Sequence, residues 1–141
     1  MRVLVVLLAF IFTLNAAQID EFATTAGYER NYQKALASAR DSNSPLMLLV
    51  VADYCPWCKK LERKVLEDPQ VIAKVKASFK AIVVDKVHDK ESFPAEFNAK
   101  LIPAIYFIDP KTAKSFYEIS TYMNKREFEL ELTKVLAEFK R

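Results

Sequence analysis

The chain has 141 residues, the size of one ordinary domain, and no Gly/Ser-rich or Pro-rich stretch divides it. Its net charge is only +3 and its charged residues are interspersed, which excludes the clustered basic surface typical of nucleic-acid-binding proteins. With two cysteines, Cys55 and Cys58, it also lacks the disulfide framework that staples many small secreted domains.

The N-terminus differs from the rest of the chain. Met1-Arg2 is followed by an apolar run from Val3 to Leu14, broken only by Thr13, and Asn15-Ala16-Ala17 supplies small residues for cleavage. An apolar run of about 12 residues is short for a membrane-spanning helix and suits the core of a signal peptide. We therefore expect a signal peptide at residues 1–17 and a mature domain at 18–141. An uncleaved membrane anchor is the alternative.

Four elements are predicted in the first half of the mature chain. Apolar residues at helical spacing predict a helix from Tyr28 to about residue 41. The continuous apolar run 46–52 predicts a central strand covered on both faces. The cysteines then open a helix. Asp68 and Pro69 suit the N-cap and first position of a further helix.

The second half continues the alternation of strands and helices. Apolar runs predict strands at 81–84 and 104–108, separated by a polar segment with a short helix at 93–98. After a turn at 109–112, residues 115–119 are expected to pair back as a hairpin. Asn124 is expected to cap a final helix. This order predicts an α/β fold, with a central mixed β-sheet flanked by helices on both faces.

The Cys-X-X-Cys pair lies at a predicted strand-to-helix junction. At the helix N-cap, the sulfur of Cys55 would face unpaired backbone N–H groups, here those of Trp57 and Cys58, and the positive end of the helix dipole. Both favour the thiolate, which is the attacking species, so Cys55 is the predicted nucleophile. Cys58, one turn further in, would resolve the mixed disulfide formed between Cys55 and a substrate.

A structural disulfide and a zinc site are the two alternative roles for the cysteines. A purely structural bond is disfavoured, because so short a loop constrains little of the unfolded chain. A zinc site needs more ligands, and His88 is the one histidine available to join the cysteines. A lone histidine in a polar loop is more often solvated. We therefore expect no metal at the cysteines.

The motif and its surroundings resemble the thioredoxin superfamily. Tyr54-Cys55-Pro56-Trp57-Cys58 follows an apolar strand, and Leu101-Ile102-Pro103-Ala104 precedes another. The flanking residues 28–46 and 68–71 resemble the exported bacterial thioredoxin-related subgroup, and the likeness covers most of residues 28–139. It implies a thioredoxin-like fold and a thiol-disulfide oxidoreductase.

The resemblance also assigns substrate-binding residues. It implies that Pro103 is the family's cis-proline facing the disulfide, and that the backbone of Ile102 hydrogen-bonds an extended substrate segment. Trp57 and Tyr54 would form part of the apolar rim, with packed surface aromatics as the alternative.

Two departures from the family pattern stand out. Cytosolic members usually carry a buried acid six positions before the first cysteine, where this chain has Leu49. Proton transfer must therefore use another group: Asp53, water and a substrate group are the candidates. Asp53 would also oppose thiolate formation at Cys55, whereas Lys59 and Lys60 would favour it. The second departure is that Gly27 is the chain's single glycine, so the glycines usual after the cis-proline are missing.

These features predict an enzyme that exchanges disulfides with exported proteins, most plausibly as a reductant without a cofactor. Its partners would be cysteine-containing substrates and a membrane or periplasmic thiol that supplies electrons. A redox-inert client-binding module, a disulfide-forming oxidase and a metal carrier are the alternatives; the last lacks the clustered Met or His ligands that soft metals favour. Because the chain ends Glu138-Phe139-Lys140-Arg141, without a retention signal, the periplasm is the expected compartment.

Overall fold

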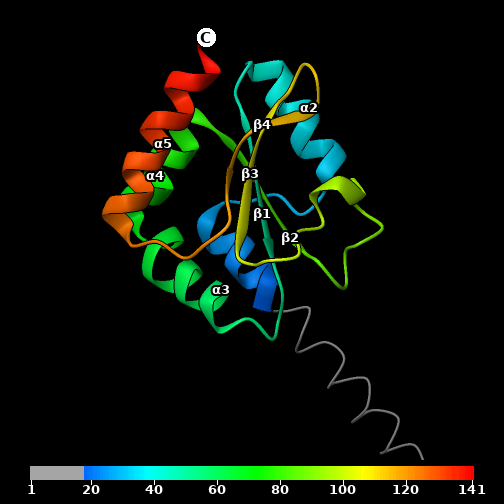
Figure 1. Ribbon diagram of the computed structural model, residues 1–141, viewed down its shortest axis with the longest axis vertical. Helices are drawn as coiled ribbons and strands as arrows, with labels where there is room; N and C mark the ends of the chain where they lie inside the picture. The colour runs from blue at the N-terminus through cyan, green and yellow to red at the C-terminus, as the bar shows by residue number, and fades with distance from the viewer. Residues whose placement is uncertain (1–17) are drawn as a thin grey trace, which may run out of the picture.

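The computed structural model describes residues 18–141, and the predicted signal peptide at 1–17 lies outside them. A four-stranded sheet forms the centre, in the order β2-β1-β3-β4, with helices on both faces (Figure 1). This confirms the predicted α/β architecture. In the described part of the chain, no helix has both the length and the apolar character needed to cross a membrane.

The sheet contains one parallel and two antiparallel pairings. β1 (Leu46–Val51) lies parallel to β2 (Lys80–Asp85) and antiparallel to β3 (Ala104–Asp109). β3 pairs antiparallel with β4 (Lys114–Ile119), and the register shifts between Phe107 and Ile108. All six residues of β1 are buried, as expected for a central strand with both faces covered.

The side chains of β1 divide between two cores. Met47, Leu49 and Val51 enter one core, and the intervening residues of the strand enter the other, because successive side chains of a strand point to opposite faces. The helix over residues 18–26, α3 (Pro56–Leu61), α4 (Pro69–Ser78) and α5 (Lys125–Phe139) supply the first core. The second core lies under α2 (Tyr32–Ser42) and the 3₁₀ helix Ala95–Phe97.

Helix boundaries show where sequence patterns succeed and fail. The caps predicted at Asp68 and Asn124 are confirmed, and Asn124 forms a full capping box with Glu127. The predicted start at Tyr28 is wrong, because α2 begins at Tyr32 with Asn31 as its N-cap. Glu29, which was expected in this helix, instead pairs with Ile82 of β2 as an isolated parallel bridge. The helix over residues 18–26 was not predicted.

Candidate active site

Cys55 begins the helix that carries the active-site pair. It is the N-cap of α3 in extended conformation, and Pro56 follows at the first helical position. The Cys58 amide donates a hydrogen bond to Cys55 Sγ across 3.1 Å. Of the two amides predicted to face this sulfur, the described hydrogen bonds include that of Cys58 and not that of Trp57. The predicted N-cap position of Cys55 is confirmed.

Cys55 and Cys58 are joined by a disulfide, with their Cα atoms 5.2 Å apart. Cys55 is 6% exposed, whereas Cys58 is 0% exposed and packs in the core with Leu61 and Val65. An external thiol or disulfide therefore reaches Cys55 more readily than Cys58. This asymmetry fits the predicted division between an attacking and a resolving cysteine.

A groove of about 300 Å³ runs beside the disulfide-bearing helix. The Ile102–Pro103 peptide bond is cis, as the resemblance implied, and leads directly into β3. The structure brings Trp57, Ile102 and Pro103 together in this groove. Its complete lining is Trp57, Leu101, Ile102, Pro103, Ser120, Thr121 and Tyr122.

Aromatic residues form one end of this groove. Trp57 is 55% exposed, and its ring centroid lies 5.4 Å from that of Tyr122. Lys60 Nζ lies 4.8 Å from the centroids of both rings, within range of a cation–π interaction. Tyr54 is exposed and does not line the groove. Sequence reasoning missed Tyr122, since no local motif marks a residue that reaches the site only through the fold.

The structure also contains a buried acid that the sequence analysis missed. Leu49 is fully buried, but Glu62, one helical turn after Cys58, is itself only 3% exposed. Its backbone N–H bonds to the carbonyls of Cys58 and Lys59, where α3 passes into a π-helical turn at Glu62–Leu66. Such π turns are frequent at functional sites.

The surroundings of Glu62 favour its neutral form. Oε1 is buried and has no hydrogen-bond partner in the structure, whereas Oε2 lies 3.5 Å from Lys59 Nζ. Burial raises the pKa of the Glu62 carboxyl, and the neighbouring Lys59 opposes that rise only in part. Glu62 also lines a polar hollow of about 300 Å³, with Gln18 and Thr25 among its neighbours. The sequence contained one signal for Glu62: it follows Cys58 by four residues, which places both side chains on the same face of a helix.

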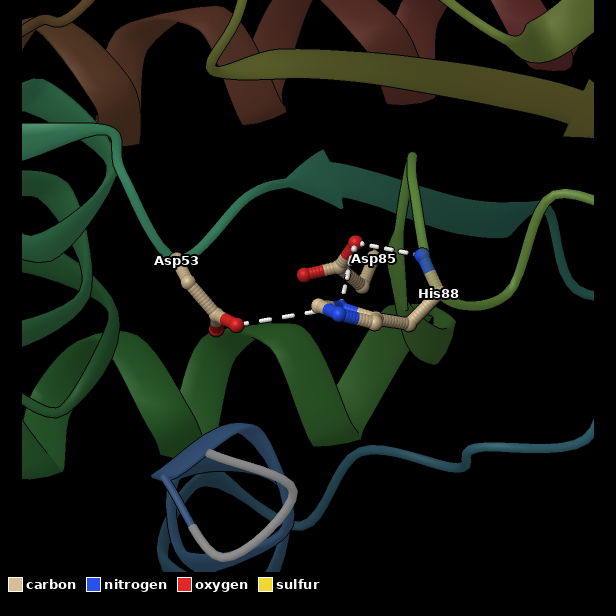
Figure 2. Close-up of side chains that lie close together, drawn as sticks. All are labelled: Asp53, Asp85 and His88. Carbon is tan, nitrogen blue, oxygen red and sulfur yellow. Dashed lines mark hydrogen bonds and ion pairs between the residues drawn. The ribbon is translucent and has the colours of Figure 1, made fainter. Parts of the chain in front are cut away.

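His88 does not lie in a cluster with the cysteines. Its Nδ1 lies 3.3 Å from Asp85 Oδ1 and 3.7 Å from Asp53 Oδ2, as Figure 2 shows. Asp53, one of the groups considered for proton transfer, therefore faces a histidine and a second carboxylate. The described His, Cys, Asp and Glu side chains close enough to share a metal ion are these three, without either cysteine.

Comparison with known proteins gives matches over most of the described chain. A family model described as a thioredoxin-like domain matches residues 32–136. A stretch of 82 residues is 39% identical to the thiol:disulfide interchange protein DsbD 1 of Pseudomonas aeruginosa, covering 54% of this chain and 13% of that protein. The human anterior gradient protein 2 homolog is 31% identical over 84 residues, covering 59% of this chain and 46% of that protein. The chain thus spans less than half of either relative.

Solved structures agree on the fold. A thioredoxin from Thermus thermophilus superposes with a TM-score of 0.68 at 23% identity, over 78% of this chain and 87% of that one. The reduced C-terminal domain of DsbD from Neisseria meningitidis gives a TM-score of 0.58 at 17% identity, over 72% and 91%.

Proposed function

The chain belongs to the family of thioredoxin-like domains, and we propose on this basis that it is a thiol-disulfide oxidoreductase that reduces disulfides in exported proteins. The observation that carries this proposal is the position of Cys55 Sγ at the start of α3, where it accepts the hydrogen bond from the Cys58 amide. The same N–H group and the positive helix end stabilise negative charge on the sulfur when the disulfide is reduced.

The reaction is a two-electron exchange in two steps. In the reduced protein, the Cys55 thiolate attacks one sulfur of a substrate disulfide, forms a mixed disulfide and releases the other substrate sulfur as a thiolate. Cys58 then loses its proton and attacks Cys55 Sγ, which forms the Cys55–Cys58 disulfide and releases the second substrate thiolate. The substrate gains two electrons, and its two thiolates take up two protons, one equivalent to that released by Cys58 and one from water. A dithiol partner of the membrane or periplasm restores the reduced enzyme by the reverse sequence.

Glu62 is the group that we assign to accept the Cys58 proton. Because burial raises the pKa of the Glu62 carboxyl, its carboxylate form is a stronger base than an exposed glutamate, and its unpartnered oxygen is suited to accept a proton from a neighbouring thiol. It lies one helical turn from Cys58, and the hollow beside it offers access to water. Asp53 is the weaker candidate, because its carboxylate lies near His88.

The groove beside the disulfide is the proposed substrate site. An extended segment would run past the cis-proline, hydrogen-bond the backbone of Ile102 as an added strand, and place an apolar side chain between Trp57 and Tyr122. Tyr54 is exposed outside the groove lining, where it would contact only the outer part of a large substrate.

The proposal includes the direction of electron flow, from this protein to its substrate, and action outside the cytoplasm. Ile102 before the cis-proline resembles reducing members of the family, and the N-terminal residues have the composition of an export signal. No cofactor is required, since the two cysteines hold the electrons. Equilibration with glutathione buffers measures direction: we expect a potential nearer to about −270 mV than to about −120 mV. A potential near about −120 mV would show instead that the protein is an oxidase.

Reduction of insulin tests the enzyme itself. We expect the wild type to turn over, Cys55→Ser to be inactive, and Cys58→Ser to accumulate a mixed disulfide with substrate. Turnover by Cys55→Ser would refute the mechanism. A wild type that binds peptides but reduces none would instead be a client-binding module. Mature protein recovered from the periplasm should lack residues 1–17, and an unprocessed chain in the membrane fraction would favour the anchor.

A further inference from the structure

Three potential metal ligands meet where the two parallel strands end. Asp53 follows β1, Asp85 is the last residue of β2, and His88 lies in the turn beyond it. Figure 2 shows both carboxylates next to the same side of the imidazole, to which dashed lines join them. One ligand atom from each residue lies within 4.8 Å of the other two. The carboxyl ends of adjacent parallel strands lie at one edge of a sheet, which explains how residues far apart in sequence converge here.

The charge in this cluster is poorly compensated. The Asp85 side chain is only 3% exposed, and Asp53 is partly buried beside it. Among the described residues, the ion pairs include no lysine or arginine at either carboxylate; nearby Arg30 pairs with Asp20 and Asp89 instead. Besides the imidazole of His88, which pairs with both carboxylates when it is protonated, a bound cation would offset their repulsion, because water screens them less here than at an open surface.

The two oxygens of Asp85 have different surroundings. Oδ1 accepts hydrogen bonds from the backbone amides of Val87 and His88, which fix the orientation of the carboxylate. Oδ2 accepts none from the described residues, and Figure 2 shows the second oxygen directed toward Asp53. A carboxylate oxygen that is directed toward the cluster and accepts no hydrogen bond from a described residue is available to a ligand.

The separations fit a small divalent ion. Zinc bound by a histidine nitrogen and carboxylate oxygens at about 2.0–2.2 Å places adjacent ligand atoms about 3.4 Å apart. His88 Nδ1 lies 3.3 Å from Asp85 Oδ1 and 3.7 Å from Asp53 Oδ2, and a small rotation of the Asp85 carboxylate would exchange its two oxygens at the ion. One nitrogen and two oxygens are donors that suit borderline divalent ions, whereas soft monovalent copper prefers sulfur ligands. We propose that Asp53, Asp85 and His88 form a binding site for a divalent transition-metal ion, with zinc as the best fit and water completing its coordination.

This site goes beyond the proposed thiol chemistry and is tested separately from it. Titration calorimetry with Zn²⁺ on tag-free protein in the disulfide form excludes the cysteines as ligands. We expect saturable 1:1 binding, weakened by about tenfold or more in His88→Ala, because loss of a direct ligand exceeds the usual effect of an outer-shell change. Asp85→Asn keeps an oxygen for the two amides and removes the charge, and should weaken binding similarly.

A matched control removes an acid from the same loop. Glu91 is exposed and enters no described ion pair, so Glu91→Gln should bind Zn²⁺ like the wild type. Absence of saturable binding to the wild type, or equal binding by His88→Ala, would overturn the proposal. Neither result would bear on insulin reduction.

Nuclear magnetic resonance adds an atom-specific readout. Because His88 is the one histidine of the sequence, its two ring nitrogens give unambiguous signals in a ¹⁵N-labelled sample. Zn²⁺ should shift the Nδ1 signal to the range of a metal-bound nitrogen and leave Nε2 protonated. If neither signal moves during the titration, or if Nε2 alone shifts, the geometry proposed here is wrong.

Discussion

The candidate active site combines two parts of different origin, here called the helical wall and the loop wall; Trp57 is the residue of the helical wall that lines the groove. The helical wall, Cys55–Leu66, is one continuous segment that carries the disulfide, Trp57, Lys60 and Glu62. The loop wall combines residues 101–103, before β3, with residues 120–122, after β4. The helical wall holds the reacting atoms and the buried acid, whereas the loop wall supplies backbone and aromatic contacts. In the proposed function the disulfide and Glu62 carry out the chemistry, whereas the loop wall contacts substrate together with Trp57, so substitutions should affect one without the other.

The largest expected effect is on the helical wall. Glu62→Gln keeps the shape of the side chain but removes the proton acceptor, so the resolving step should slow by about 100-fold at neutral pH. Rapid mixing of the reduced enzyme with a peptide disulfide measures formation and decay of the mixed disulfide separately. Formation should be nearly unchanged. Equal rates of decay in Glu62→Gln and wild type would remove Glu62 from the mechanism.

The loop wall gives the next largest effect. Tyr122→Ala removes the ring that faces Trp57 and should raise KM for peptide substrates by about tenfold, the typical cost of losing one aromatic anchor. Reaction with a small aromatic disulfide, which needs only Cys55, should not change. Tyr54→Ala is the matched comparison, with an effect of about twofold or less expected for a ring outside the groove lining. A reversed order would move the binding site toward Tyr54.

Glu62 also gives a smaller, pH-dependent effect on stability. Because burial raises its pKa in the folded state, the unfolded chain releases this proton first as pH rises, and the folded protein loses stability through that interval. Glu62→Gln lacks this loss. Urea unfolding of the disulfide form should show the variant gaining on wild type as pH rises past the pKa of glutamate in the unfolded chain, by about 1.4 kcal/mol for each unit by which burial raises the Glu62 pKa. If the free energy of unfolding changed with pH in the same way for both proteins, the Glu62 carboxyl would be solvated in the folded state.

The smallest expected effect concerns the contact between the walls. Lys60 lies over both Trp57 and Tyr122, and a cation–π interaction at a partly exposed site is worth about 0.5–1 kcal/mol. Lys60→Gln should therefore raise KM for peptides about threefold with kcat unchanged. Lys60→Arg should retain wild-type KM, since guanidinium also stacks on aromatic rings. Failure of arginine to rescue would point to a specific role for the ammonium.

Local sequence patterns predicted the helical wall well. The N-cap position of Cys55, the apolar strand before it and the capped helix at Asp68 all depend on residues close in sequence. Glu62 was missed because Lys59, Lys60, Arg63 and Lys64 surround it, and such a charged run resembles a solvated helix face. Its spacing from Cys58 indicated otherwise, but only packing showed which side of the helix is buried.

The loop wall depends on contacts that sequence patterns do not contain. Pro103 was identified through family resemblance, whereas Tyr122 has no motif and reaches Trp57 only after β3 and β4 have paired. The cluster of His88, Asp53 and Asp85 was missed although both aspartates follow predicted strands. The decisive fact was that β1 and β2 are parallel neighbours. The helix over residues 18–26 was not predicted, although its buried residues follow helical spacing: Ile19, Phe22, Ala23 and Ala26.

The bridge between Glu29 and Ile82 also protects one edge of the sheet from pairing with a second copy of the protein. Glu29 accepts a hydrogen bond from the Val83 amide and donates one to Ala81, so the outer margin of β2 is partly sealed. The opposite margin, β4, presents the exposed charged residues Lys114 and Glu118, and its pairing with β3 is irregular. Charge and irregularity at an outer strand discourage sheet-to-sheet aggregation.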